Sequence, residues 1–183
     1  MNNTPPTRNR KLPAKPSKEE KVYRSKRNVL LDIVEQNFDE YKDLDENHLH
    51  RKYSSMCHLK CSKQVDGQER TYFVKDASCK ELMINQHLCR MYPDGLVATI
   101  RFPLLQETIR VSENCHLLCF EWMEITDRQV WTPVAADMQN VVNAFREMTG
   151  VHHDDDMGGN YYWRESNKTF LLFDFGDAQL RPS

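Results

Sequence analysis

The chain has 183 residues, of which 39% are hydrophobic and 28% are charged, and its formal net charge at pH 7 is -2. This length supports one modest core and leaves little room for a second independent domain. The sequence has no long apolar run, which argues against a signal peptide or a membrane-spanning segment. Together with six cysteines, this favours a soluble protein of a reducing compartment, the cytoplasm or the nucleus.

Residues 1–28 carry much of the positive charge. They hold nine lysines and arginines against two glutamates, an excess of seven positive charges. Four prolines and few large apolar side chains accompany them, so the segment cannot offset the entropy cost of ordering, and we expect a disordered basic arm. Such an arm would bind nucleic acid, an acidic protein or an import receptor, or it would only aid solubility.

Residues 28–43 predict an amphipathic helix within a segment that spans residues 29–49. Leu30, Val34, Phe38 and Tyr41 recur at helical spacing, while most acidic side chains fall elsewhere on the helix. We therefore expect a helix that precedes the main domain and packs on it.

The next segment alternates between strand and helix patterns. A D-G pair at Asp66 and Gly67 predicts a hairpin turn. A helix is expected over residues 78–91, where apolar residues recur before Pro93 and Gly95. The strand candidates are Met56–Lys63, Thr71–Lys75, Leu96–Leu105 and Cys115–Met123. About five short antiparallel strands interrupted by one helix would form an α+β half-domain.

Two cysteine pairs share the pattern C-H-x-x-C, at Cys57–Cys61 and Cys115–Cys119. The pattern invites a zinc hypothesis. Both pairs fall in strand candidates, where residues four apart are separated by about 13 Å, whereas two thiolates on one zinc lie within about 4.6 Å. Neither pair alone can chelate a metal, and we expect the cysteines to act as small buried hydrophobic residues.

A further helix is predicted over residues 132–148. Thr132 can cap it, Pro133 suits its first position, apolar residues recur at helical spacing, and Gly150 follows as a stop signal. The helix leads directly into an aspartate-rich stretch.

Two short motifs then follow in order. His153, Asp155 and Asn160 fit the pattern H-x-D-x-x-x-x-N, and residues 174–176 read D-F-G. A predicted helix precedes the first motif, and an apolar strand candidate, Thr169–Phe173, precedes the second. Two motifs in this order, each after the element that such a fold requires, are much more specific than either motif alone.

The two motifs resemble the catalytic loop and the metal-binding turn of the protein-kinase-like superfamily. Protein kinases and small-molecule kinases of the aminoglycoside phosphotransferase or choline type share this arrangement. The resemblance implies that the chain binds ATP and Mg²⁺, with Asn160 and Asp174 as oxygen ligands of the metal. Asp155 would orient the substrate hydroxyl or accept its proton, and His153 would hold the loop and the turn together.

The segment Tyr72–Lys75 resembles the V-A-I-K motif of the third strand of these kinases. The resemblance implies that Lys75 contacts the α- and β-phosphates of the nucleotide. Glu81, the only acidic residue in the following predicted helix, would form the ion pair that orients Lys75. No G-x-G-x-x-G motif precedes Lys75, and residues 53–56 would at best turn a hairpin, so the usual backbone cradle for phosphates is not encoded.

Leu118–Glu124 resembles the hinge that holds the adenine base. Backbone groups of Glu121 and Met123 would bind the base, and Phe120 would close the back of the pocket. An ordinary buried strand has the same pattern, because recognition through the backbone leaves little trace in side-chain identity.

Several features depart from protein kinases. Met157 stands where they carry a lysine or arginine that neutralises transition-state charge. Asp154 replaces the arginine that in many of them reads a phosphorylated activation loop. Only seven residues follow Gly176 in this sequence, so we expect a truncated large lobe. Either a partner or a second copy completes this lobe, or the chain is a minimal kinase with an unusual substrate surface.

The expected fold is α+β and protein-kinase-like, with an antiparallel five-stranded small lobe that carries one helix and a short, mainly helical large lobe. The expected divisions are a disordered basic arm at residues 1–28, an amphipathic helix segment at 29–49, a small lobe at 50–124 and a truncated large lobe at 125–183.

Three functions follow from these expectations. The first is an ATP- and Mg²⁺-dependent kinase that transfers the γ-phosphate to a hydroxyl, on serine or threonine of a protein. The second is a small-molecule phosphotransferase, which would normally need a large helical substrate lobe. The third is a pseudokinase that docks on a partner kinase and regulates it.

Overall fold

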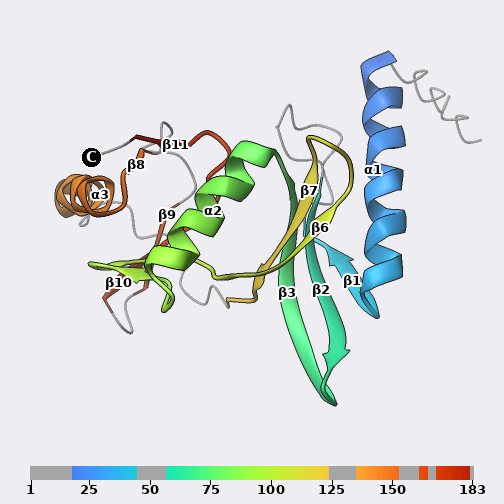
Figure 1. Cartoon of the computed structure of the whole chain (residues 1–183), viewed down its shortest axis with the longest axis horizontal. Helices are drawn as coiled ribbons and strands as arrows, with labels where there is room; N and C mark the ends of the chain where they lie inside the picture. Colours follow the sequence, from blue (N-terminus) through green and yellow to red (C-terminus); the bar gives the residue numbers. More distant parts are fainter. Residues whose placement is uncertain (1–17, 45–56, 124–134, 153–160, 165–167, 182–183) are drawn as a thin grey trace, which may run out of the picture.

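A computed structural model describes residues 18–44, 57–123, 135–152, 161–164 and 168–181. These ranges contain three helices and eleven strands (Figure 1). A five-stranded sheet with helix α1 beside it forms one end of the molecule, and helix α3 with short strands forms the other (Figure 1).

The five-stranded sheet is antiparallel throughout, in the order β1-β2-β3-β7-β6. Its strands are β1 (Glu40–Asp43), β2 (His58–Val65), β3 (Gln68–Ala77), β6 (Leu105–Arg110) and β7 (His116–Glu121). The predicted β2–β3 hairpin is present. Asp66 and Gly67 form its turn with φ angles of 53° and 77°, as a two-residue turn with positive φ at both positions requires. The expected five-stranded antiparallel sheet is thus confirmed.

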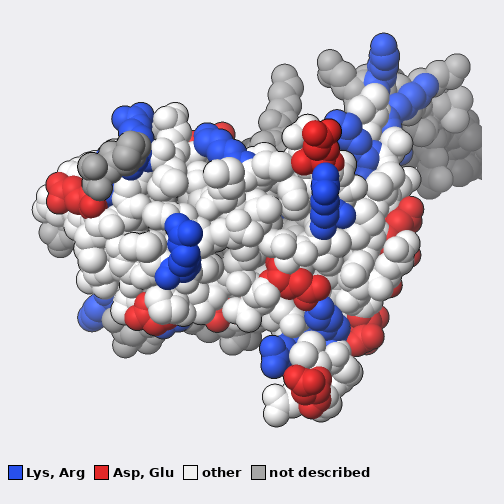
Figure 2. Space-filling view, viewed as in Figure 1, with Lys and Arg blue, Asp and Glu red and all other residues white. Residues whose placement is uncertain are grey.

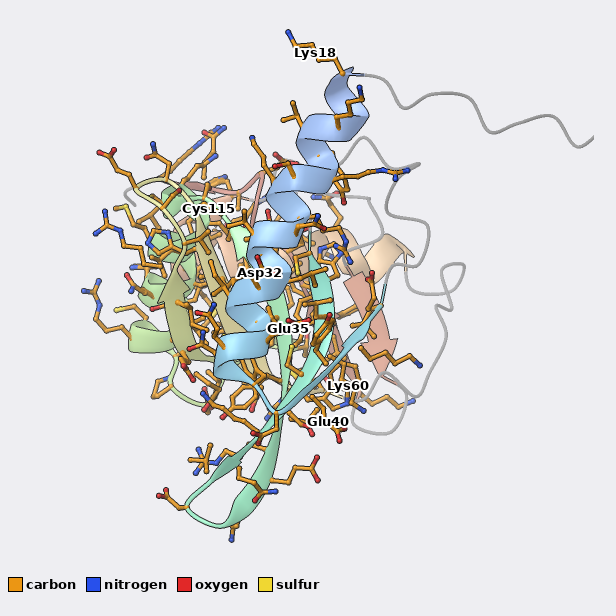
Figure 3. All side chains as sticks on the ribbon, turned by 90° about the vertical axis from the view of Figure 1, so that its right-hand side faces the viewer. Lys18, Asp32, Glu35, Glu40, Lys60 and Cys115 are labelled. Atoms are coloured by element: carbon orange, nitrogen blue, oxygen red, sulfur yellow. The ribbon has the colours of Figure 1, made fainter. Side chains whose placement is uncertain are left out.

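Helix α1 (Lys18–Asn37) lies across one face of this sheet (Figure 3). Leu30 and Val34 of the helix are buried in one core with three residues of the sheet, Leu59 of β2, Val74 of β3 and Leu117 of β7. The predicted packing of an amphipathic helix on the domain is therefore correct, and the apolar stripe is the reason for it.

The ends of this helix differ from the prediction. It begins at Lys18, within the segment expected to be a disordered arm, and its first turns extend beyond the sheet with lysine and arginine side chains exposed (Figures 2 and 3). Lysine, glutamate and arginine favour helix, and the buried Arg27 forms an ion pair with Asp43 that fixes this part of α1. Residues 1–17 of the expected arm lie outside the described residues.

The C-terminal part of the expected helix is instead strand β1, which pairs with β2. Tyr41, expected on the buried stripe, is 38% exposed. Backbone hydrogen bonds to β2 stabilise a strand here, a long-range effect that helical spacing cannot reveal.

Helix α2 (Cys79–Met91) lies on the other side of the sheet from α1, between the two ends of the molecule (Figure 1). The Ser78 hydroxyl caps it by accepting a hydrogen bond from the Glu81 amide at 3.3 Å. The helix ends at Met91, two residues before Pro93, as the sequence predicts. Ile84 and Leu88 form its buried face.

The prediction of a single strand over Leu96–Leu105 is wrong. Residues 96–101 form a short antiparallel pair, β4 (Leu96–Val97) and β5 (Ile100–Arg101), and Ala98 between them has a φ of 51°. These strands join a second sheet in the order β4-β5-β10-β9, which includes β9 (Tyr161–Arg164) and β10 (Thr169–Leu172). Strand β6 shares only Leu105 with that prediction, and its other residues were left unassigned by the sequence pattern.

Helix α3 (Ala135–Thr149) is followed by Gly150, which has a φ of 69°. A Cβ at this glycine would lie 2.6 Å from the Arg181 carbonyl oxygen, so the position requires glycine. The predicted start at Thr132 and Pro133 lies outside the described residues. After Gly150, β8 (Val151–His152) pairs with β11 (Gln179–Leu180). The described part of residues 125–183 thus contains one helix and four short strands, where a mainly helical lobe was expected.

The described residues have two large apolar cores. One lies between α1 and the five-stranded sheet and includes the buried thiols of Cys57, Cys61 and Cys119, which confirms the sequence interpretation for these three. The other lies between α2, α3 and the second sheet. No described helix has the length and apolarity needed to cross a membrane.

Candidate active site

Lys75 lies between the two cores, near the end of β3. Its ammonium donates hydrogen bonds to Glu81 Oε1 at 2.8 Å and to Asp174 Oδ1 at 2.7 Å. The side chains of Lys75 and Glu81 are each 4% exposed, whereas that of Asp174 is 39% exposed. The ion pair expected between Lys75 and Glu81 is therefore present, and Asp174 joins it from a segment 99 positions further along the chain.

The two carboxylates compete for one ammonium, and their pKa values move in opposite directions. Burial raises the pKa of Glu81 and outweighs the attraction of Lys75, and the nearby Asp174 charge adds to the rise. Burial alone would also raise the pKa of Asp174. The charge of Lys75, hydrogen bonds from Lys75 and the Gly176 amide, and the charge of His58 together lower it. The more exposed carboxylate, Asp174, is thus the stronger acid of the two.

Lys75 remains charged in this setting. Burial alone would lower its pKa, but the charges of Glu81 and Asp174 and their hydrogen bonds raise it above the ordinary value of lysine. A buried ammonium is costly unless it is paired and hydrogen-bonded, and both conditions are met here.

The turn at residues 174–176 holds the Asp174 carboxylate in place. Asp174 has a φ of 62°, and the Gly176 amide donates to its Oδ1 at 3.0 Å. A Cβ at Gly176 would lie 3.1 Å from Asp174 Oδ1 and 3.6 Å from Glu81 Oε2, so only glycine leaves this carboxylate undisturbed. Phe175 is 1% exposed and packs in the same core as Ile84 of α2, which anchors the turn.

Aromatic rings line the sheet face that carries Lys75. Because side chains alternate along a strand, Phe73 lies on the same face of β3 as Lys75. The Phe73 ring stacks on His58 of β2, with centroids 5.9 Å apart, and on Phe120 of β7, with centroids 6.3 Å apart. Sequence reasoning missed His58 and Phe73 as site residues. The period-two pattern of the predicted hairpin was the signal that could have found them.

The expected hinge segment is fixed to its neighbours by backbone hydrogen bonds. The Glu121 amide donates to the Leu104 carbonyl at 3.0 Å, and the Trp122 amide donates to the Thr71 carbonyl at 3.2 Å. The amide of Glu121 is thus committed, and base recognition by this residue would use its carbonyl oxygen. Met123 is half-buried. Adenine binding by Phe120, Glu121 and Met123 stays a prediction.

The expected catalytic loop lies outside the described residues. This applies to His153, Asp154, Asp155, Met157 and Asn160 and also to residues 53–56. Strand β8, which leads into the loop, pairs with β11 directly after the D-F-G turn. Within the described part of the chain, no three His, Cys, Asp or Glu side chains are arranged to hold a metal. Of the two expected metal ligands, Asn160 and Asp174, only Asp174 lies in that part.

The five-stranded sheet, the helix that follows β3 and the Lys75–Glu81–Asp174 cluster define a protein-kinase-like fold. A comparison of folds supports this assignment: the chain resembles the solved structure of the Cydia pomonella granulovirus kinase PK-1, with a TM-score of 0.50 and 14% sequence identity. The match covers 84% of this chain and 57% of the granulovirus kinase, so the chain spans little more than half the length of that protein.

A second structure, the BubR1 kinase domain, matches with a TM-score of 0.49 and 13% identity over 68% of this chain and 43% of that domain. No protein-family model matches the sequence. No curated protein sequence matches it either. The likeness thus concerns the fold.

Proposed function

We propose that the chain is an ATP- and Mg²⁺-dependent phosphotransferase that transfers the γ-phosphate of ATP to a serine or threonine hydroxyl of a protein. The observation that carries this proposal is the contact of one buried ammonium, Lys75, with both Glu81 and Asp174. The kinase-like fold supports the same proposal, because a lysine and a glutamate at these places are expected to form an ion pair in such a fold.

The asymmetry of the two carboxylates supports a ligand-binding role. Glu81 is buried and orients Lys75, while Asp174 is the more exposed and more acidic of the two. The three side chains carry two negative charges against one positive charge. This surplus attracts a cation, and a divalent cation would in turn bind the phosphates of a nucleotide.

The donor chemistry fits Mg²⁺, which prefers hard oxygen ligands. The Asp174 carboxylate and the Asn160 amide oxygen would hold the metal, which would neutralise charge on the phosphates when bound. Lys75 would hold the α- and β-phosphates, and Asp155 would orient the substrate hydroxyl and accept its proton. The backbone of the segment from Glu121 to Met123 would position the base.

A thermal shift experiment tests the proposal. At a ligand concentration of about a hundred times Kd, binding stabilises a protein by about 2.7 kcal/mol, which raises Tm by about 5–10 °C for a chain of this length. We expect such a rise with Mg²⁺-ATP for the wild type and none for Asp174→Ala. Asp177→Ala is the matched control, because Asp177 is exposed and lies three residues further along; it should respond as the wild type does.

Transfer of ³²P from labelled ATP to a generic protein substrate completes the test. A wild type that shows no Mg²⁺-ATP shift yet binds a partner kinase would be a docking module, contrary to the proposal. Transfer only to an added small-molecule hydroxyl would place the chain with the small-molecule phosphotransferases.

A further inference from the structure

Two features of the site remain without a function in the proposal above. The sequence has no glycine-rich motif before Lys75 to bind phosphates through backbone amides. The sheet face around Lys75 also carries a histidine, His58, which a phosphate-binding role for Lys75 alone does not require. The position of His58 connects the two features.

His58 lies directly opposite Lys75 in the antiparallel pairing of β2 and β3. Side chains of directly opposed residues leave the sheet on the same face, with their Cβ atoms about 4.5–5.5 Å apart. His58 is half-buried, so part of the residue remains accessible to solvent. The charge of His58 also acts on Asp174. The His58 side chain therefore leaves the sheet beside that of Lys75, on the face where the proposed nucleotide would bind.

The orientation of the His58 ring is set by stacked neighbours. Its plane lies at 28° to that of Phe73, and Phe73 lies at 27° to Phe120, which is 4% exposed. The buried Phe120 ring thus supports Phe73, which supports His58. A ring held in this way loses little further freedom when it binds a ligand, which favours binding.

We propose that His58 binds the phosphate groups of the nucleotide alongside Lys75, an inference that rests on the proposed function. A ring N–H of His58 donates a hydrogen bond to a phosphate oxygen, and Lys75 donates from the neighbouring strand. This donor partly replaces the backbone amides that a glycine-rich motif would supply. The ligand class is a nucleoside polyphosphate, and the contact is to its phosphates and not to its base.

The test compares Mg²⁺-ATP with adenosine by isothermal titration calorimetry. His58→Phe keeps a ring that can stack on Phe73 but removes the N–H donor. We expect it to bind Mg²⁺-ATP about 10- to 100-fold more weakly, the range for a hydrogen bond to a charged group, while adenosine affinity changes less than about twofold. His116→Phe is the matched control; His116 lies at the opposite end of β7 from Phe120, beside Cys79, and the variant should bind both ligands as the wild type does.

His58→Gln separates the donor from the ring, because it retains a side-chain N–H and loses the aromatic stack. It should bind Mg²⁺-ATP more tightly than His58→Phe, and the reverse order would overturn the inference. Circular dichroism melting of each variant without ligand verifies folding.

The other outcomes distinguish this inference from the proposed function. If the wild type binds Mg²⁺-ATP and His58→Phe binds it equally well, the role of His58 is refuted and the proposed function stands. An equal loss of adenosine and Mg²⁺-ATP binding in His58→Phe would show a role in the base site and also refute it. A wild type that binds neither Mg²⁺-ATP nor tripolyphosphate would refute both.

Discussion

The two carboxylates that contact Lys75 are not equivalent, and their difference suggests a division of labour. Glu81 comes from a capped helix, is buried with Lys75, and has a raised pKa because burial dominates its environment. Asp174 comes from a turn, is more exposed, and has a lowered pKa. A buried ion pair contributes little net stability. Its retention together with an accessible third member is better explained by ligand binding than by stability.

Gly176→Ala tests how closely the turn holds Asp174. The added Cβ would lie 3.1 Å from Asp174 Oδ1, closer than an ordinary contact, so this carboxylate, which is hydrogen-bonded to Lys75, must shift. We expect a loss of about 1–3 kcal/mol in the free energy of unfolding, as for other overpacked sites, measured by urea denaturation. The Tm rise with Mg²⁺-ATP should shrink as well. An unchanged rise would mean that the exact position of Asp174 is unimportant for binding.

At the scale of helices and strands, features that depend on neighbouring residues were predicted correctly, whereas features that depend on pairing between distant segments were not. The Asp66–Gly67 turn, the end of α2 before Pro93 and the glycine after α3 each depend on a few neighbouring residues, and each was found from the sequence. Strand β1 depends on its pairing with β2. The Lys75–Glu81 pair could be predicted because its members lie six residues apart. The period-two pattern of the hairpin could place His58 and Phe73 on one face, but the stacking of Phe73 on Phe120 depends on the non-local pairing of β3 with β7 and could not be predicted.

The core between α1 and the sheet predicts a specific sensitivity to alkaline pH. Burial raises the pKa of Cys57, Cys61 and Cys119 from 9.0 to about 12. Above about pH 9 the unfolded chain loses these protons and the folded chain keeps them. Stability is therefore fully present below about pH 9 and falls as pH rises toward 12, by about 1.4 kcal/mol per pH unit for each thiol.

Cys119→Ala removes one of these thiols, so its free energy of unfolding should fall less steeply with pH than that of the wild type, by about 1.4 kcal/mol per unit above about pH 9. Urea denaturation between pH 8 and pH 10.5 measures both slopes. Leu59→Ala is the control, because it removes volume from the same core without removing a titrating group; its loss should be the same at every pH. Parallel curves for the wild type and Cys119→Ala would show that the thiol ionises equally in both states.

At the scale of the whole molecule, the site lies where two separately packed cores meet. One core, under α1, supports β2 and β3 from behind. The other includes Ile84 and Leu88 of α2, Phe145 of α3 and Phe175 of the D-F-G turn. Lys75 belongs to the sheet, while Glu81 and Asp174 belong to elements of the second core. The site therefore depends on how the second core holds α2 and the turn against the sheet.

A pair of truncations in the two cores tests this dependence. Phe175→Ala should lower the free energy of unfolding by about 3–5 kcal/mol and Leu30→Ala by about 2–5 kcal/mol, because each removes a buried side chain. Urea denaturation measures both losses. Only Phe175→Ala should also reduce the Tm rise with Mg²⁺-ATP, because Phe175 adjoins Asp174 whereas Leu30 lies behind the sheet. Phe175→Leu, a milder change, should show the same effect to a smaller degree. If Leu30→Ala reduced the rise as much as Phe175→Ala at equal loss of stability, the ligand response would report overall stability, and the second core would have no special role in holding the site.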